Sequence, residues 1–524
     1  MKFNKGQTVG IDLGTTFSAI AVLDKQGNPV AIPNEDDEEE TPSLVLMAEG
    51  GHVIVGPNRM RAAMEEPERV IERVKREMGN ADYKRVFDGE ELTPEFISAL
   101  ILKKLRQDAE KRVGPIGNAV ITVPYYFNDA RRKATQDAGH IAGLNVIDII
   151  NEPTAATLTY AWHRGELGGT GGEETKRTAM VYDLGGGTFD VTLVRYTPTH
   201  FEVLATDGDV HLGGVDWTDR LVDFACDAFQ EKHGTDPRDS PQSMQVLRND
   251  CDMAKLVLSD SEKVNITVRH ENKAITVPMT RTQFEELTAD LLQRTADTTE
   301  LVLDMASMSA SELDAVVLVG GSTLMPCVPR ILEEITGQKP YQGLSPHTAV
   351  AQGAAIHAAI LEAKHRGDQS ELAPAIRKKL GVVKQDDVNS HALGLIIRDP
   401  RNNQYRNIVM IPRNTKLPAK MKQTFATHEE NQQRVSVKVV EGDAPDPDAC
   451  SMIGKCTVHG LPTPLPKGSP IEVSYIINTA GRVEILAHDK TGGRQAQIHI
   501  ERKGGLNNSQ IDNYTRLANE YQVD

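Results

Sequence analysis

One pattern occurs twice in the chain, as VGIDLGTTFS at residues 9–18 and as MVYDLGGGTFD at residues 180–190. In each copy an apolar strand ends in an aspartate, a turn of glycine and threonine follows, and a second apolar strand begins. Glycines without side chains let backbone N–H groups point at an anion, and the threonine hydroxyls add further donors. We therefore interpret the two copies as the halves of one phosphate clamp.

Asp12 and Asp183 occupy the same place in the two copies, at the end of a strand. Two carboxylates that face one anion require a cation between them. Mg²⁺ suits this position because it keeps most of its waters and uses one or two carboxylates together with phosphate oxygens. A single Asp-Leu-Gly turn is as often an ordinary hairpin. Two copies favour a duplicated architecture around a shared cleft.

Length and composition limit the class of protein. A chain of 524 residues is long enough for about two to four domains, and its net charge of −16 argues against nucleic acid or an anionic membrane as the main partner. The five cysteines include no C-x-x-C pair, which is typical of a reducing compartment. No run of about 18 apolar residues occurs, so we expect a cytoplasmic protein.

The first third of the chain alternates helical and strand patterns. Residues 58–76 place apolar and charged side chains at helical spacing and predict a helix that carries Lys75. Residues 93–111 begin with Thr-Pro-Glu and predict a second helix. Strands alternate with helices over residues 119–153, which predicts a layered α/β domain. Glu152 ends a strand just before a helix, where it either reaches a bound metal or complements the helix dipole.

The later part of the chain changes in texture. A third glycine turn, VGGST at residues 319–323, follows a buried strand, and its free amides are suited to a phosphate or a ribose. Neither a Walker A motif nor a G-x-G-x-x-G fingerprint occurs, which disfavours P-loop and Rossmann folds. Residues 364–391 are charged and read as a linker. Beyond them apolar residues alternate with period two, which predicts an antiparallel β domain, and residues 506–523 predict one polar helix.

Six motifs, taken in order, closely resemble those of the seventy-kilodalton heat-shock chaperone family. They are VGIDLGTTFS, ITVPYYFND, IINEPTAA, YDLGGGTFD, HLGG and VGGST. The resemblance implies an α/β actin-like (ribonuclease H-like, duplicated) nucleotide-binding domain, an antiparallel β-sandwich that binds peptides, and a short C-terminal helix. The implied boundaries are residues 1–364 for the nucleotide-binding domain, 365–387 for the linker, 388–504 for the sandwich and 505–524 for a residual first lid helix, which we expect to brace the sandwich.

The resemblance also implies ATP or ADP with Mg²⁺ in the cleft. It implies catalytic roles for Lys75, Glu152, Asp183 and Thr188, and metal binding, mainly through water, for Asp12 and Asp183. The expected nucleotide contacts are Asp12, Gly14, Thr15, Thr16, Phe17, Gly185, Gly186, Gly187, Thr188, Gly213, Gly214, Asp252, Lys255, Ser259, Gly320, Gly321, Ser322 and His347. The expected lining of the peptide pocket is Leu395, Phe425, Val435, Val437, Ile471 and Val473. Pro124 and Arg132 resemble the relay between the cleft and the peptide domain.

Several positions depart from the family pattern. Leu256 and Leu324 replace two arginines near the adenosine, and the loss of two planar cations predicts weaker nucleotide binding. His347 stands where the family usually has an aspartate. The linker carries Lys-Gln-Asp at residues 384–386 in place of leucines. These residues offer little apolar area for docking, so we expect weak stimulation of the ATPase by peptide.

The leading hypothesis is therefore an ATP-dependent molecular chaperone that binds extended apolar segments of unfolded proteins. A J-domain co-chaperone and a nucleotide exchange factor are the partners that the resemblance implies, and neither nucleic acid nor a membrane is expected. One alternative is a nucleotide-regulated scaffold that serves one partner with little turnover. Another is a metabolite kinase, which shares the duplicated clamp but leaves the β domain unexplained.

Overall fold

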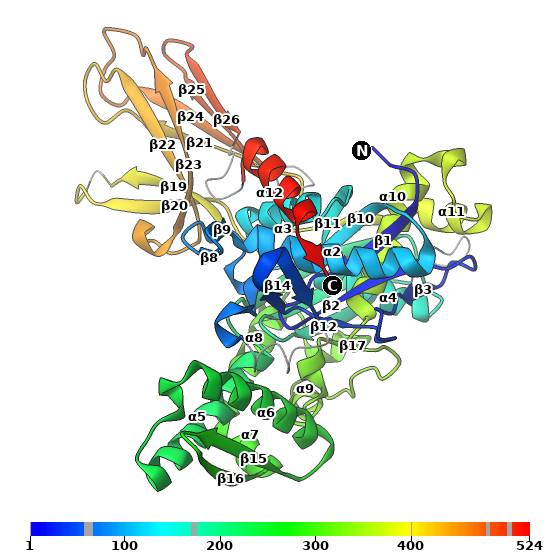
Figure 1. Cartoon of the computed structure of the whole chain (residues 1–524). Helices are drawn as coiled ribbons and strands as arrows, with labels where there is room; N and C mark the ends of the chain where they lie inside the picture. The colour runs from blue at the N-terminus through cyan, green and yellow to red at the C-terminus, as the bar shows by residue number, and fades with distance from the viewer. Residues whose placement is uncertain (1, 57–65, 169–174, 400, 478–482, 500–505) are drawn as a thin grey trace.

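The computed structural model describes residues 2–56, 66–168, 175–399, 401–477, 483–499 and 506–524. This part of the chain contains two similar sheets with helices around them, a separate pair of antiparallel sheets, and three smaller pairings of strands (Figure 1).

The two repeated turns belong to two sheets of the same design. In each sheet a meander of three antiparallel strands is extended by a parallel strand beside its first member. The first sheet has the order β11-β10-β1-β2-β3 and the second the order β17-β12-β13-β14-β18. The strands of the first sheet are β1 (Gln7–Asp12), β2 (Phe17–Leu23), β3 (Pro29–Ala31), β10 (Ile116–Val123) and β11 (Val146–Asn151). Those of the second are β12 (Arg177–Leu184), β13 (Phe189–Thr197), β14 (His200–Asp209), β17 (Ala315–Val319) and β18 (Lys384–Asp386).

Helices bury the sheets in three apolar cores. The helices α4 (Glu152–His163) and α10 (Ala349–His365) pack on each other and contact both sheets, while α2 (Pro94–Val113) and α3 (Asp129–Ile141) cover the first sheet. Thr93 caps α2 by accepting a hydrogen bond from the Phe96 amide, as the sequence predicts. The second sheet carries a further layer, seen at the bottom of Figure 1. It contains α5 (Gly214–His233), α6 (Pro241–Asp260), β15 (Lys263–His270), β16 (Lys273–Thr280) and α7 (Arg281–Leu287). The helices α8 (Ala289–Met305) and α9 (Cys327–Thr336) lie above it in the figure, with α8 packed on β13 and β14.

The predicted helix over residues 58–76 is wrong for the part that the structure describes. Residues 57–65 lie outside the described residues. From Pro67 the chain forms the 3₁₀ turn η2 (Pro67–Arg69), the short strand β7 (Val70–Ile71) and the 3₁₀ turn η3 (Val74–Glu77). Arg73 has a left-handed backbone with φ 60°, which no α-helix accepts. Strand pairing of β7 with β5 (Val45–Met47) therefore overrides the local helical pattern.

The predicted antiparallel β domain is present as two sheets around one core. One sheet has the order β20-β19-β22-β23 and the other β21-β24-β25-β26. Their facing side chains, such as Tyr475 and Ile485, are fully buried. The strands are β19 (Leu393–Arg398), β20 (Tyr405–Ile411), β21 (Ala419–Ala426), β22 (Arg434–Glu441), β23 (Ser451–His459), β24 (Pro470–Ile477), β25 (Val483–Asp489) and β26 (Gln495–His499).

The charged segment between the two parts is folded rather than extended. It forms α11 (Pro374–Gly381) and then β18, which adds a parallel strand to the edge of β14. Leu380 and Val383 are fully buried in the core shared with α10. The segment therefore packs as part of the first unit, although its sequence predicts a linker.

The C-terminal helix is present but lies elsewhere than expected. The helix α12 (Asn508–Glu520) packs against α2 and α3 of the first unit, where Tyr514 and Tyr521 both contact the ring of Phe96. After it, β27 (Gln522–Val523) pairs in parallel with β6 (His52–Val55). Burial of these aromatic rings on α2 explains why the helix does not brace the sandwich (Figure 1).

Candidate nucleotide cleft

The two glycine turns touch each other. A methyl group on Gly186 would lie 2.2 Å from Thr16 Oγ1, and one on Gly187 would lie 2.5 Å from Thr15 Cγ2. Only glycine therefore lets the second turn approach the threonines of the first. Within the first turn the Gly14 amide donates to Ser18 Oγ at 3.1 Å, and Phe17 is partly exposed. The pattern that occurs twice in the sequence thus converges on one place in the fold.

A cluster of ionisable side chains lies beneath the two turns. Lys75 Nζ donates to Glu152 Oε1 at 2.7 Å, and each side chain is only 6% exposed. Asp12 Oδ1 accepts a hydrogen bond from Thr122 Oγ1 at 2.9 Å. Asp183 and Asp190 face each other across the pairing of β12 with β13. The aspartates lie near strand ends, Glu152 is the first residue of α4, and Lys75 lies in η3.

The electrostatics of the cluster favour an added cation. Burial, together with the charge of Glu152, raises the pKa of Asp12 to about 7 and that of Asp190 to about 8. The same causes raise the pKa of Asp183 well above its usual value. Burial alone would lower the pKa of Lys75, but the neighbouring carboxylates outweigh it and raise that pKa. One ammonium group therefore faces four carboxyl groups, which leaves negative charge for a cation to neutralise.

The donor set suits magnesium with phosphate rather than a metal held by protein alone. The donors beside the turns are oxygens, from Asp12, Asp183 and the hydroxyls of Thr15, Thr16 and Thr188, and of these Asp183, Thr15 and Thr188 are buried. Within the described ranges, no group of three or more His, Cys, Asp or Glu side chains is arranged to hold a metal ion. Mg²⁺ fits these residues because it accepts one or two carboxylates and completes its shell with waters and phosphate oxygens.

The predicted adenosine contacts lie on the side of the second sheet. Lys255 Nζ donates to the Gly214 carbonyl and to Thr218 Oγ1, both at 2.7 Å. Thr218 Oγ1 in turn donates to Asp252 at 2.6 Å, and Ser322 Oγ donates to the Gly185 carbonyl at 3.0 Å. The third glycine turn, with φ 84° at Gly320, thus contacts the second one. Ser259 lies one helical turn after Lys255 on α6 and donates to its carbonyl.

The positions that depart from the family pattern have distinct surroundings. Leu256 is 54% exposed and Leu324 is 49% exposed, so neither packs in a core. His347 lies against Gly321, and its Nδ1 is 2.8 Å from Glu40 Oε2. The hydrogen bond that His347 donates to the Glu40 carboxylate raises the pKa of His347. The histidine therefore bonds to the acidic loop near the first turn, a partner that sequence reasoning missed.

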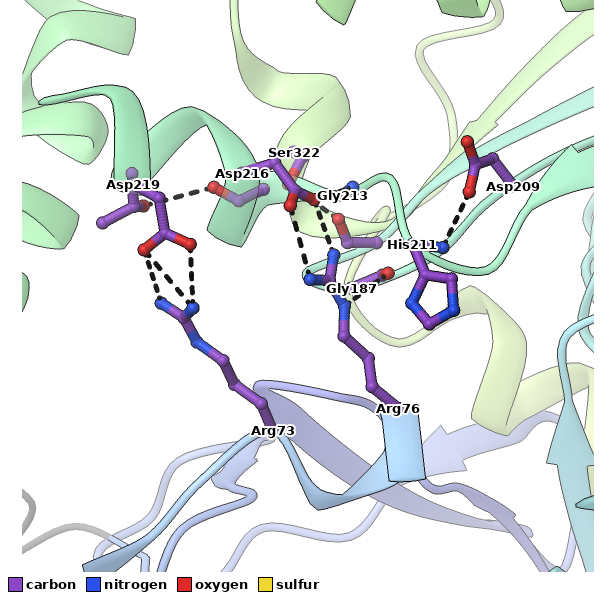
Figure 2. A network of polar contacts seen from close by, with 12 residues as sticks. Arg73, Arg76, Gly187, Asp209, His211, Gly213, Asp216, Asp219 and Ser322 are labelled. Atoms are coloured by element: carbon purple, nitrogen blue, oxygen red, sulfur yellow. Dashed lines mark hydrogen bonds and ion pairs between the residues drawn. The ribbon is translucent and has the colours of Figure 1, made fainter. Parts of the chain in front are cut away.

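Two arginines, Arg73 just before η3 and Arg76 within it, reach across to α5, as Figure 2 shows. Arg76 Nε donates to the Gly187 carbonyl at 3.0 Å, and its guanidinium pairs with Asp216 at 2.6 Å. Asp216 also accepts from the Gly213 amide at 2.8 Å, at the start of α5. Arg73 pairs with Asp219 at 3.1 Å. The sequence displays these arginines, but the matching three-residue spacing of the two aspartates was the signal that sequence reasoning missed.

The cleft is connected to the charged segment through β11. Asn151, which precedes Glu152, donates to Asp387 Oδ2 at 2.7 Å and accepts a bond from Arg132. Tyr125 OH donates to the Asp387 carboxylate and, at 2.8 Å, to the Val388 carbonyl. Burial raises the pKa of Asp387 despite these bonds. Adjacent residues of β11 and α4 thus contact the Lys75 ammonium and the segment that leads to the sandwich.

The sandwich and the first unit share further polar contacts. Asp386 accepts from His200 at 2.9 Å and pairs with Lys416 at 2.8 Å, and Lys416 also pairs with Glu202. Arg413 pairs with Asp207 at 3.2 Å. Docking of β18 therefore uses ion pairs and backbone pairing where leucines are absent.

The predicted peptide-pocket residues fall into two groups. Four of them, Leu395, Val437, Ile471 and Val473, are at most 4% exposed and belong to the core between the two sheets. Phe425 and Val435 pack on that core and keep some exposure. The large apolar side chains exposed on these strands are instead Tyr405, Val409, Met421 and Met452.

The comparisons with known proteins agree with this arrangement. A family model described as Hsp70 protein matches residues 8–524. The chain is 38% identical over 531 aligned positions to "Chaperone protein DnaK" of Thermotoga petrophila and, with the same identity, to those of Thermotoga sp. strain RQ2 and Thermotoga maritima. Each alignment covers all of this chain and 85% of the relative. No helix in the described residues has the length and apolar character needed to cross a membrane.

Proposed function

Because this chain belongs to the Hsp70 protein family, we propose that the cleft between its two glycine turns is the site where it binds and hydrolyses ATP. The chain is an ATP-dependent molecular chaperone and an ATPase. Contact between the turns is the observation that carries the proposal, because Gly186 lies against Thr16 and Gly187 lies against Thr15. The family implies an actin-like fold for this part of the chain, and we extend that fold to the duplicated, ribonuclease H-like design of the two sheets.

The buried cluster supports distinct roles for its members. When bound, Mg²⁺ neutralises phosphate charge, and Asp12 and Asp183 would hold its waters. Lys75 is held by Glu152, so its ammonium is positioned before the nucleotide arrives and offers charge where it develops in the transition state. Thr188 lies at the start of β13, where its carbonyl accepts from the Gly185 amide at 3.0 Å and fixes the shape of the turn.

The adenosine would lie against Gly213, Gly214, Lys255, Ser322 and the two exposed leucines. The exposed leucines offer apolar contact to a purine but lack the charge of a stacking guanidinium. We therefore propose that the nucleotide is bound less tightly than in relatives with arginine at these positions. The remaining predicted contacts, Asp252, Ser259, Gly320, Gly321 and His347, lie around this region.

Coupling between the cleft and the sandwich is proposed to pass through Glu152 and Asn151. A change in the bond between Lys75 and Glu152 would shift the start of α4, and Asn151 would carry that shift to Asp387. Pro124 and Arg132 flank this connection, and the bond from Arg132 to Asn151 supports a role for the arginine. In this proposal the ion pairs of β18 hold the segment on the first unit, because its few apolar side chains offer little area for docking.

Unfolded polypeptides and co-chaperones are the partners that the family implies. We propose that the sandwich binds extended apolar segments between Phe425 and Val435, which border the core and keep some exposure. The four buried pocket residues would reach a peptide only if the strands around them separate. A J-domain protein, a nucleotide exchange factor and a cytoplasmic location remain parts of this proposal.

Phosphate release separates the candidate functions. Purified protein is given MgATP alone, MgATP with a sugar, or MgATP with an unfolded polypeptide, and binding is followed in parallel by calorimetry. We expect slow release with ATP alone and only weak stimulation of that release by the polypeptide. Phosphate transfer to the sugar would identify a metabolite kinase. Tight ATP binding without turnover in any mixture would identify a nucleotide-regulated scaffold, which the exposed leucines and the polar linker keep as the second candidate.

A further inference from the structure

Two arginine–aspartate pairs cross in parallel from η3 and the residue before it to α5. Arg73 and Arg76 are three residues apart on one side, and Asp216 and Asp219 are three residues apart on the other. In each pair both terminal nitrogens of the arginine, Nη1 and Nη2, donate hydrogen bonds to the carboxylate, at 3.1–3.3 Å for Arg73 and at 2.6–3.3 Å for Arg76 (Figure 2). Such two-pronged geometry fixes direction as well as distance.

The two sides of this ladder belong to different cores. Val74, next to Arg73, is buried in the core of the first sheet, whereas Trp217 and Leu221, which flank Asp219, are buried in that of the second. Among the described residues, no strand pairing joins the first sheet to the second. The pairs therefore form only when the two sides of the cleft stand at the distance seen here.

The inner and outer pairs differ in what else they touch. Arg76 also bonds to the Gly187 carbonyl of the phosphate turn, so it belongs to the binding site itself. Arg73 contacts neither glycine turn, and its Asp219 partner is 42% exposed. The outer pair thus spans the cleft away from the phosphate turns and faces solvent.

The backbone at Arg73 is held in a conformation that disfavours most residues. Its φ of 60° lies in the left-handed region, which is sparsely populated outside glycine, asparagine and aspartate. The buried residues Val74 and Lys75 follow directly, in η3. This backbone turns the Arg73 side chain toward α5 while Lys75 points into the cleft, and such local strain is often associated with a functional site.

We propose that Arg73 and Asp219 form a clasp across the nucleotide cleft, which slows the release of bound nucleotide by holding the two sides together. The proposal rests on the proposed function, because it assumes that nucleotide binds in this cleft. Arg73 is a positioning residue, since it touches the opposite wall and not the phosphate turns. The pair is partly exposed, so we expect an effect of about 3- to 10-fold on the dissociation rate, which salt reduces.

Nucleotide release from the full chain tests the clasp. Dissociation of a fluorescent ADP is followed by stopped flow for the unmodified protein, Arg73→Gln and Asp219→Asn. We expect each variant to release ADP about 3- to 10-fold faster, and the double variant to be no faster than either single one. Arg220→Ala is the matched control, because Arg220 lies on the same helix as Asp219 but pairs at 2.6 Å with Asp290 of α8, without crossing the cleft. We expect less than a twofold change for it.

Charge reversal separates a clasp from a simple structural role. Arg73→Asp combined with Asp219→Arg restores an ion pair in the opposite sense, and aspartate tolerates the left-handed backbone. We expect this combination to return the release rate to within about twofold of the unmodified protein. Unchanged release in the single variants, or no recovery on reversal, would overturn the clasp.

A measurement without nucleotide keeps the two proposals distinguishable. Hydrogen exchange of residues 70–79 and 212–222 reports opening of the cleft in the nucleotide-free protein. We expect faster exchange in Arg73→Gln and Asp219→Asn but not in Arg220→Ala, and unchanged exchange would contradict the clasp. If the unmodified protein binds no ADP, the proposed nucleotide function fails, and the exchange data alone then decide whether the pair closes the cleft.

Discussion

The two glycine turns share one backbone design but differ in the residue opposite the key aspartate. In the first turn Asp12 pairs across the strands with Ala19, whereas in the second Asp183 pairs with Asp190. Ala19 is buried beside Ala351 and Ala355 of α10, so an acid there would have no room. The first turn therefore contributes threonine hydroxyls and one carboxylate, and the second contributes glycines and a pair of carboxylates.

The two turns show how the copies of a duplicated element become different in charge. The backbone pattern is kept because it turns amides toward an anion, while side chains diverge to place negative charge on one side. The excess carboxylates of the second turn face Lys75, which comes from η3 on the side of the first sheet. Lys75 thus supplies, from the side of the first sheet, the positive charge that the second turn lacks.

Removal of Lys75 should produce the largest effect. Lys75→Ala leaves four acidic groups without their cation at the place where phosphate charge develops. We expect single-turnover hydrolysis to fall by roughly 100-fold or more, while ATP binding changes only a few-fold. Lys84→Ala, an exposed lysine paired with Glu91, is the control. Hydrolysis at an unchanged rate would show that catalysis does not need the Lys75 ammonium.

The acid pair of the second turn should make stability depend on pH. The folded-state pKa of Asp190 is about 8, above its unfolded value, so the native state binds the extra proton. The contribution of Asp190 to the free energy of unfolding is then fully present near pH 4 and is lost as the pH rises toward 8. We expect the unfolding temperature of the nucleotide-free protein to fall between pH 5.5 and pH 8, and to fall less in Asp190→Asn.

Asp260→Asn, at the exposed end of α6, serves as the control for that measurement. If the unfolding temperatures measured by calorimetry decline equally in the unmodified protein and in Asp190→Asn, the raised pKa of Asp190 does not cause the pH dependence of stability.

The exposed leucines should give the smallest effect. Leu256→Arg and Leu324→Arg each add a planar cation next to the proposed base position. We expect each change to tighten ATP binding by about 0.5–1 kcal/mol, or about 2- to 5-fold, by cation–π stacking. Leu301→Arg, at an exposed leucine of α8, controls for the added charge. If calorimetry finds equal gains in ATP affinity at all three sites, general attraction between the added cation and the anionic nucleotide explains them. Leu256 and Leu324 then do not lie beside the base.

Local patterns in the sequence predict the turns well and the contacts between distant segments poorly. The strand ends at Asp12 and Asp183 and the cap of α2 depend on neighbouring residues, so the sequence alone identifies them. The helix expected over residues 58–76 failed because pairing of β7 and the left-handed Arg73 depend on tertiary contacts.

The same limit applies to the charged segment and the C-terminus. Lys384, Gln385 and Asp386 have no apolar pattern, yet backbone pairing with β14 and the contacts of Asp386 with His200 and Lys416 make them a strand. The position of α12 depends on the ring of Phe96, far away in the sequence. Ion pairs such as that of Arg73 with Asp219 are equally invisible until the fold brings their partners together.

We propose that the two turns form one ATP site only because they touch. Gly186→Ala would place a methyl group 2.2 Å from Thr16 Oγ1 and force the turns apart, whereas Gly381→Ala adds a methyl group with its nearest neighbour at 3.9 Å. Calorimetric titration of MgATP into the unmodified protein and both variants tests the claim directly. We predict binding by the unmodified protein and by Gly381→Ala, with affinity at least about tenfold lower in Gly186→Ala, equivalent to about 1.4 kcal/mol. Equal affinity in all three proteins would contradict it.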